Sequence, residues 1–410
     1  MVDPDEMATL EYIPTIPKFL EFIKKQYSDY PAISDKVTTY TYEELVSRVA
    51  KRVTFINSLG LEKGSNIAVL AKNDLDAMEL FLAIPAAGHV LIMLPNALND
   101  KALAGISMKF DLAGMFVGKE FTEVTANLPC KTWSSTSIGE TESTFADVEK
   151  DTTAAIFFTG GTTGAPKGAV HSHGSIMRGS FNGVFGPGSI LHKRYIAMLP
   201  LSHIFGAIMG YMAKLYTGSL TYTCTDMRAG IGDIPVVRPT TLVLVPGLVE
   251  IILNIAKLKG RAFLGDLELI MCGAAPVPPR QMEECRELGI TLCAGYGLTE
   301  CANLTSGNCD TDKKPESMGH IYPEQQVKVV DGELWIKGDN VMKEYYKDPE
   351  HTAEVLEDGW FKTGDLVEFD DNDWIYITGR IKNLIILPNG ENVSPEEIEE
   401  LFYKQPLVKD

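Results

Sequence analysis

Residues 156–168 read I-F-F-T-G-G-T-T-G-A-P-K-G, an apolar stretch that runs into a loop of glycines and threonines with a lysine near its end. Glycine allows close approach of the backbone, so successive N–H groups can wrap a polyphosphate, and Lys167 adds a cation. The loop is not a Walker motif, because Gly168 follows the lysine where Ser or Thr would be required. The segment therefore predicts a strand and a phosphate-binding loop, with candidate contact residues Thr159, Gly160, Gly161, Thr162, Thr163, Gly164 and Lys167.

On both sides of this loop, apolar runs of strand length alternate with segments of helical pattern. The expected strands are 66–70, 113–117, 195–199, 241–245 and 267–271, and the expected helices are 75–87, 101–108, 248–256 and 281–288. Strands with helices between them are typical of an α/β fold with a largely parallel sheet. From Gln326 the pattern changes, and short strands at 327–330, 333–336, 366–369 and 374–377 predict a small antiparallel unit.

The length and charge of the chain narrow the class of protein. It has 410 residues, 55 acidic and 37 basic, for a formal net charge of −18. That length predicts two or three structural units, and the acidic balance argues against a nucleic-acid-binding surface. The sequence contains no run of apolar residues long enough for a transmembrane helix. The acidic N-terminus lacks the basic start and apolar core of a signal peptide, so we expect a cytoplasmic protein without a transmembrane segment.

Seven cysteines are distributed without any CxxC pair. Zinc ligands normally occur two to four residues apart, so no structural metal is expected, and free thiols in a reducing compartment are favoured.

The end of the sequence predicts a further element. S-P-E-E at 394–397 combines an N-capping serine with a proline and acidic residues in the first turn, which favours a helix start. Ile398, Leu401 and Phe402 then form an apolar stripe that has no partner before Asp410. We therefore expect a second domain that is cut off shortly after it begins, because so few residues cannot bury a core of their own.

Further motifs follow the loop in a fixed order. They read L-P-L-S-H-I-F-G at 199–206, C-G-A-A-P at 272–276, Y-G-L-T-E at 296–300, W-F-K-T-G-D at 360–365, G-R-I-K-N at 379–383 and G-E-N-V-S-P-E-E-I-E at 390–399. With the loop, this series resembles the adenylate-forming superfamily of acyl- and aryl-CoA synthetases, peptide synthetase adenylation domains and beetle luciferases. The AMP-forming acyl-CoA ligases are the most similar group.

The resemblance implies a fold and a domain division. We expect a large N-terminal AMP-binding domain of layered αβαβα sheets at residues 1–379, with a small antiparallel β-barrel-like unit at 325–379. Residues 380–410 are expected to hold the interdomain hinge and the truncated start of an α+β C-terminal domain.

The resemblance also assigns roles at a nucleotide site. Tyr296 would stack on adenine, Thr299 would contact the α-phosphate and Glu300 would bind Mg²⁺, a hard cation that prefers oxygen ligands. Asp365 would accept from the ribose hydroxyls. The expected nucleotide-binding set, besides the loop, is Gly273, Ala274, Ala275, Pro276, Tyr296, Gly297, Thr299, Asp365, Ile377, Arg380 and Lys382.

A second group of residues is expected around the carboxylic acid. These are His203, Phe205, Gly206, Ala207, Gly247, Ala294 and Gly295. A histidine among apolar residues is commonly a core residue, and that alternative stays open for His203. The expected catalytic residues are Lys167, His203, Thr299 and Glu300.

The implied activity is AMP-forming ligation of a carboxylic acid to coenzyme A with ATP and Mg²⁺, leaning towards medium- or long-chain fatty acids. The absence of a Ser/His/Asp triad agrees, since this chemistry depends on positioning and charge neutralisation. An amino-acid-activating domain is disfavoured because residues 203–207 carry no acid to pair with a substrate ammonium. A luciferase-like oxygenase, a carrier-protein acceptor in place of coenzyme A, and an inactive regulatory or truncated form remain alternatives. Because the resemblance implies a catalytic lysine on the C-terminal domain, the 410-residue chain is expected to be impaired as a ligase. The oligomeric state cannot be read from the sequence.

Overall fold

The first part of the chain builds a seven-stranded sheet around fully buried apolar strands. The computed structural model describes residues 4–159, 167–383, 385–386 and 392–393. In it, β3 (Asn66–Leu70) is buried along its whole length between two parallel neighbours, β4 (Val90–Met93) and β5 (Leu112–Val117). The sheet order is β18-β8-β7-β4-β3-β5-β6, with β8 and β18 antiparallel. Its remaining strands are β6 (Lys131–Ser134), β7 (Thr153–Thr159), β8 (Lys167–Ser172) and β18 (Glu344–Tyr345).

The second half of the αβαβα arrangement contains two smaller sheets that lie next to each other. A four-stranded sheet has the order β2-β1-β10-β9, formed by β1 (Pro31–Ser34), β2 (Thr39–Thr41), β9 (Arg194–Ala197) and β10 (Leu220–Thr223). A five-stranded sheet has the order β11-β12-β13-β14-β15, formed by β11 (Thr241–Leu244), β12 (Leu269–Cys272), β13 (Thr291–Tyr296), β14 (Ser306–Asn308) and β15 (His320–Ile321). Hydrogen bonds between Arg194 and Thr240 join the two sheets.

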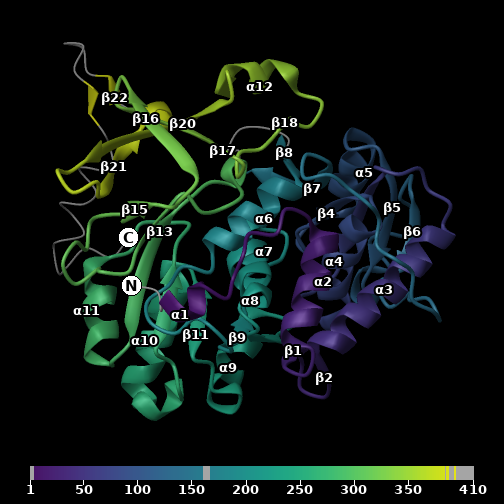
Figure 1. Ribbon diagram of the computed structural model, residues 1–410, viewed down its shortest axis with the longest axis horizontal. Coiled ribbons are helices and arrows are strands. Elements are labelled where there is room, and N and C mark those ends of the chain that lie inside the picture. The colour runs from purple at the N-terminus through teal and green to yellow at the C-terminus, as the bar shows by residue number, and fades with distance from the viewer. Residues whose placement is uncertain (1–3, 160–166, 384, 387–391, 394–410) are drawn as a thin grey trace.

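Helices fill the space between the sheets and cover their outer faces (Figure 1). Ile67 and Val69 of β3 face a core shared with the central helices, whereas Ala68 and Leu70 face the core under α5. On the far side, α10 and α11 pack on β11, β12 and β13. The helices are α1 (Pro4–Met7), α2 (Ile16–Tyr27), α3 (Tyr42–Ser58), α4 (Leu75–Ala86), α5 (Asp100–Lys109), α6 (His173–Asn182), α7 (Ile204–Ala207), the π-helical η2 (Ile208–Met212), α8 (Ala213–Tyr216), α9 (Met227–Val237), α10 (Pro246–Lys259), α11 (Pro279–Glu287) and α12 (Pro349–Val355). Short 3₁₀ turns are η1 (Lys119–Phe121), η3 (Arg261–Leu264), η4 (Thr299–Cys301) and η5 (Ile381–Asn383).

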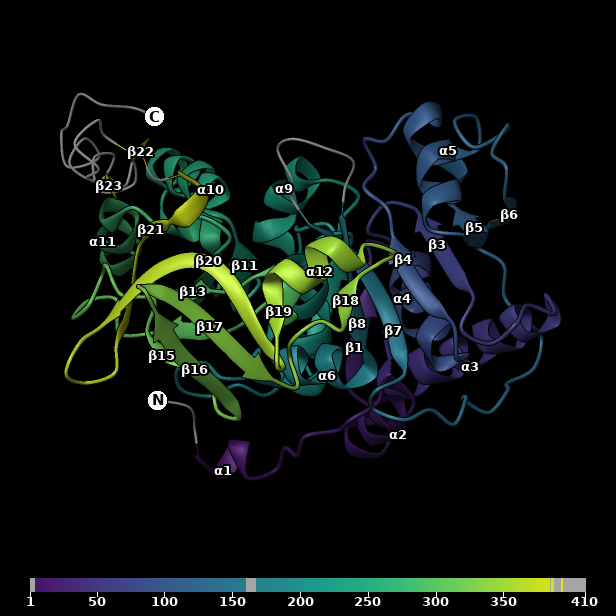
Figure 2. The same cartoon turned by 90° about the horizontal axis from the view of Figure 1, so that it is seen from above.

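A small antiparallel sheet covers one end of these layers, as Figure 2 shows from above. It has the order β16-β17-β20-β19, with β21 paired to β20. Its strands are β16 (Gln325–Val330), β17 (Glu333–Gly338), β19 (Leu356–Glu357), β20 (Trp360–Phe369) and β21 (Ile375–Arg380). A separate pair, β22 (Ile385–Ile386) and β23 (Asn392–Val393), follows. The sheet packs its own core against Ala169 of β8 and Cys301 of η4.

The α/β class and layered architecture predicted from the sequence are confirmed, but one local prediction needs correction and two helices were not predicted. The strand expected at 366–369 begins at Trp360, so Asp365 lies within β20. Gly364 has a φ of 71°, and the pairing shifts register next to Leu366, which shows that the chain bends there without leaving the sheet. The helices α2 and α3 had no counterpart among the expected elements.

Among the described residues, none of the helices combines the length and apolar character needed to cross a bilayer. The predicted helix start at 394–397 and its apolar stripe lie outside the described residues.

Candidate active site

A carboxylate, a phenol and a guanidinium meet where the five-stranded sheet approaches the small antiparallel sheet. Tyr296, the last residue of β13, donates from its hydroxyl to Oδ2 of Asp365 over 2.5 Å. Arg380 of β21 donates to the same carboxylate through Nε and, at 3.4 Å, through Nη2. The antiparallel register places Asp365 directly opposite Arg380. Three residues far apart in the sequence are thus fixed as one cluster.

The electrostatics of this cluster follow from its burial. Asp365 is only 2 % exposed, so its charge needs a nearby cation and donors. The bond to Asp365 raises the pKa of Arg380, and burial followed by the Asp365 charge raises the pKa of Tyr296 well above its usual range. The guanidinium therefore stays charged and the phenol protonated at neutral pH.

A second cluster joins Lys167 and Glu300 through a tyrosine that sequence reasoning missed. The hydroxyl of Tyr345 donates to Oε1 of Glu300 over 2.7 Å, and Nζ of Lys167 lies 5.1 Å from the centre of the Tyr345 ring. Strand β18 pairs with β8, which brings Tyr345 beside the strand that Lys167 begins. The backbone N–H of Met342 also donates to the Glu300 carbonyl over 2.7 Å.

The backbone of Thr299 is held from behind by His171, which the sequence analysis did not place in the site. Nε2 of His171 lies 2.8 Å from the Thr299 carbonyl oxygen, and Nδ1 lies 3.1 Å from Oγ of Ser175. Burial lowers the pKa of His171 to about 4, so the ring is neutral at physiological pH. Because a carbonyl oxygen only accepts, Nε2 carries the proton. A bond between residues 128 positions apart leaves no local pattern in the sequence.

The segment expected at the acid pocket is anchored by Asn73, in the loop before α4. The Asn73 amide donates to the Leu199 carbonyl over 2.8 Å, and the Leu201 N–H donates back to Asn73 Oδ1 over 3.2 Å. His203 follows as the exposed N-cap residue of α7, so the core-histidine alternative is wrong. Gly206 is required at its position, because a Cβ there would lie 2.3 Å from the Pro200 carbonyl oxygen.

Small residues occupy the ends of β12 and β13 beside this segment. A Cβ on Gly273 would lie 3.3 Å from the Phe205 ring, so the ring lies close against the strand end. The next residues, Ala274, Ala275 and Pro276, form an exposed loop, and Ala274 has a φ of 67°. Ala207 and Ala294 are buried, Gly295 is half-buried, and Gly247 is exposed with no atom within 4 Å of its would-be Cβ.

The remaining predicted residues are scattered or undescribed. Ile377 packs partly buried in the core of the small sheet, and Lys382 is exposed in η5. Thr159 ends β7 opposite Lys167, which fixes both ends of the loop. Gly160, Gly161, Thr162, Thr163 and Gly164 lie outside the described residues.

Comparison with known proteins identifies the family. The model of the family described as AMP-binding enzyme matches residues 20–346, which is most of the chain. The chain belongs to this family.

Relatives of this AMP-binding enzyme agree with the assignment. It is 28 % identical over 394 residues to a feruloyl-CoA synthase of Amycolatopsis sp, covering 91 % of this chain and 79 % of that protein. It is 27 % identical over 376 residues to a 2-succinylbenzoate–CoA ligase of Listeria monocytogenes, covering 90 % and 79 %. The structure of ATP-bound MatB from Rhodopseudomonas palustris superposes with a TM-score of 0.85 at 26 % identity, covering 96 % of this chain and 84 % of that one. The predicted membership in the adenylate-forming superfamily, near the AMP-forming CoA ligases, is confirmed.

Proposed function

We propose that this AMP-binding enzyme ligates a carboxylic acid to coenzyme A in two half-reactions. In the first, an oxygen of the acid attacks the α-phosphorus of ATP, which forms an acyl-adenylate and releases pyrophosphate. In the second, the coenzyme A thiol attacks the acyl carbonyl, loses its proton and displaces AMP. A carrier-protein thiol as acceptor would follow the same chemistry. Two clusters carry the proposal. In one, Lys167 contacts the ring of Tyr345, whose hydroxyl donates to Glu300. In the other, Tyr296 and Arg380 both donate to Asp365.

Each charged residue in these clusters fits one part of ATP. Lys167 stands at the end of the glycine-rich loop, where a cation neutralises phosphate charge. Glu300 offers carboxylate oxygens for Mg²⁺, with Tyr345 fixing the direction of the carboxylate. Mg²⁺ bound with ATP would supply Lewis-acid stabilisation of the phosphates. Asp365 would exchange its bond with Tyr296 for the ribose hydroxyls while Arg380 keeps its charge compensated.

The acid is proposed to be a medium- or long-chain aliphatic acid bound next to α7. The apolar ring of Phe205 lies beside Gly273, and Ala294 belongs to the same apolar core, which offers an apolar surface to an aliphatic chain. Residues 203–207 carry no acidic side chain for a substrate ammonium. The seven cysteines are free, which fits a reducing compartment, and we propose the cytoplasm.

Pyrophosphate exchange tests the proposal. The 410-residue chain is mixed with ATP, labelled pyrophosphate and a panel of aliphatic and aromatic acids, and ATP binding is measured in parallel by calorimetry. We expect acid-dependent exchange, and a loss of about 100-fold for Lys167→Ala because a charge aimed at the transferred phosphate is removed.

Lys150→Ala is the matched control, because Lys150 is an exposed lysine paired with Asp339. It should exchange like the parent chain. Exchange by Lys167→Ala at the parent rate would show that Lys167 does not serve the phosphates, and absence of ATP binding by the parent chain would overturn the function itself.

A further inference from the structure

The helical segment that begins at His203 leads to a buried lysine. α7, η2 and α8 follow one another without a break from Ile204 to Tyr216. Phe205 and Met209 pack in the core that covers the five-stranded sheet. A π-helical turn spaces residues on one face five positions apart instead of four. Lys214, five residues after Met209, therefore lies on the same face of the helix as Met209. Lys214 therefore lies on the side of the helix that carries the expected acid pocket.

Lys214 is a buried cation without a counter-ion. The residue is 2 % exposed, and its Nζ lies 3.7 Å from Sδ of Met271 and 4.3 Å from the centre of the Tyr195 ring. In the part of the chain that the structure describes, no carboxylate lies within ion-pair distance of it. Burial lowers the pKa of Lys214 to about 7. Lysines are almost never fully buried unless they are paired, and an anion bound at this amine would hold it in the charged form.

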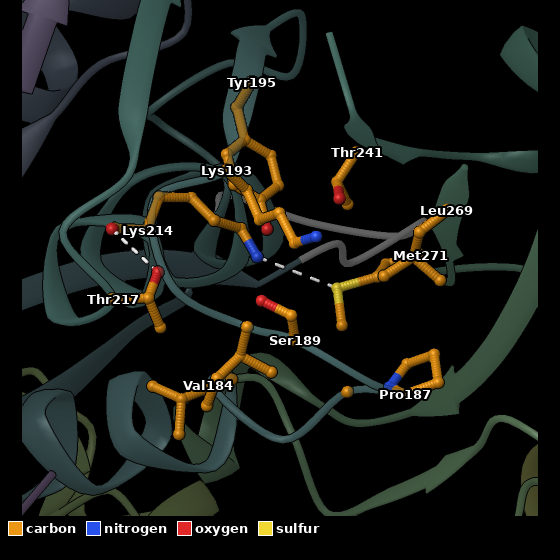
Figure 3. A pocket seen from close by; sticks show the side chains of 13 residues that line it. Val184, Pro187, Ser189, Lys193, Tyr195, Lys214, Thr217, Thr241, Leu269 and Met271 are labelled. Carbon is orange, nitrogen blue, oxygen red and sulfur yellow. Dashed lines mark hydrogen bonds between the residues drawn. The ribbon is translucent and has the colours of Figure 1, made fainter. Parts of the chain in front are cut away.

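A small cavity lies at the Lys214 amine (Figure 3). Its volume is about 20 Å³, enough for one water-sized group. The walls are largely apolar and include no acid; the polar members are Ser189, Lys193, Tyr195, Lys214, Thr217 and Thr241. Two carboxylates contact residues of this wall: Oε2 of Glu268 lies 3.8 Å from Nζ of Lys193, and Glu6 accepts a hydrogen bond from Ser189. The cavity thus presents net positive charge at its buried end.

The cavity and the expected acid pocket lie at opposite ends of the same strand. Met271 of β12 touches Lys214, and two residues further on Gly273 faces the Phe205 ring. Leu269, which lines the cavity, and Gly273 are four residues apart, or about 13 Å along an extended strand. Met271 stands between them on the strand and Met209 belongs to the same core, and methionine is flexible enough to move aside for a chain.

We propose that Lys214 binds a second carboxylate at the far end of the acid, and that the enzyme activates medium-length dicarboxylic acids. The inference rests on the proposed function, because the first carboxylate must be adenylated beside Phe205 and Gly273. The acid enters there, runs along β12 and brings one oxygen of its terminal carboxylate into the cavity, where the charge supplies the missing counter-ion. A simple fatty acid of equal length would leave the ammonium buried and unpaired.

Matched pairs of acids test this specificity. Hexanedioic, octanedioic and decanedioic acids are compared with hexanoic, octanoic and decanoic acids in pyrophosphate exchange, for the parent chain, Lys214→Met and Lys193→Met. We expect the parent chain to prefer the diacid of at least one pair. Lys214→Met should lose that preference by at least about 10-fold, mainly through KM, because it keeps length but not charge. Lys193→Met, which removes a charge at the rim of the same cavity, should keep the preference.

Binding and stability measurements separate the possible failures. Calorimetric titration with the diacids reports binding without catalysis, so Lys214-dependent binding without exchange would keep Lys214 as the carboxylate-binding residue while removing the proposed function and with it the activation of diacids. Replacing an unpaired buried ammonium by methionine should raise Tm. A parent chain that prefers monoacids overturns the inference. So does a Lys214→Met chain with lowered Tm and unchanged selectivity, which would make Lys214 a structural residue.

Discussion

At the scale of single residues, the site is organised by tyrosines that hold carboxylates in place. Tyr296 donates to Asp365, and Tyr345 donates to Glu300. Both phenols have raised pKa values, from burial first and from the neighbouring carboxylate second. They therefore remain donors over the physiological range, and the carboxylates keep one fixed direction. A carboxylate that binds a metal depends on such a partner for its orientation.

Changing Tyr345 to phenylalanine removes only the hydroxyl that Glu300 accepts from. We expect Tyr345→Phe to raise the Mg²⁺ concentration for half-maximal pyrophosphate exchange by at least about 10-fold, with a smaller effect at saturating Mg²⁺. Tyr346→Phe is the control, because the neighbouring hydroxyl donates to Asp111 instead. An unchanged Mg²⁺ dependence in Tyr345→Phe would mean that this hydroxyl does not orient a metal ligand.

At the scale of elements, the sequence predicted what depends on local pattern and missed what depends on distant pairing. The strand at 66–70 is apolar throughout because both its faces are buried, and α4 begins after Asp74 because that side chain caps Ala77. The motif residues Asp365 and Arg380 could be expected at one site from resemblance alone. Tyr345 could not be, since β18 joins β8 at the edge of a sheet formed some 170 residues earlier in the chain.

The turn between β13 and η4 positions Thr299 and Glu300, and it packs closely around Gly297. A Cβ on Gly297 would lie 1.3 Å from the Asn303 carbonyl oxygen, so the turn that carries Thr299 and Glu300 cannot close around a side chain. We expect Gly297→Ala to abolish measurable ATP binding and to lower the free energy of unfolding by at least about 2 kcal/mol. Gly295→Ala, whose Cβ would meet its nearest atom at 3.4 Å, should lower it by less than about 1 kcal/mol. Equal effects of the two changes in denaturant unfolding and calorimetry would contradict the tight turn.

At the scale of the whole molecule, the layers around the seven-stranded sheet enclose three neutral histidines. His89 precedes β4, His171 lies in β8 and His173 begins α6. All three are at most 2 % exposed. Burial lowers the pKa of each to about 4, with Lys63 adding to the effect at His89. The pKa of Asp74 shifts in the opposite direction, because burial raises it to about 6.

These histidines predict that the protein loses stability in mild acid. Each folded-state pKa lies below the unfolded value of about 6.5, so the unfolded chain takes up protons first as the pH falls. The stabilisation is complete above about pH 6.5 and is lost towards pH 4, by up to about 3 kcal/mol for each histidine. Urea unfolding at pH 7.5, 6, 5 and 4.5 should show a falling midpoint, and His89→Gln, which lies away from the site clusters, should flatten the fall by about a third. A midpoint that stays constant to pH 4.5, or a His89→Gln chain with the parent slope, would show that burial of these rings does not control the acid response.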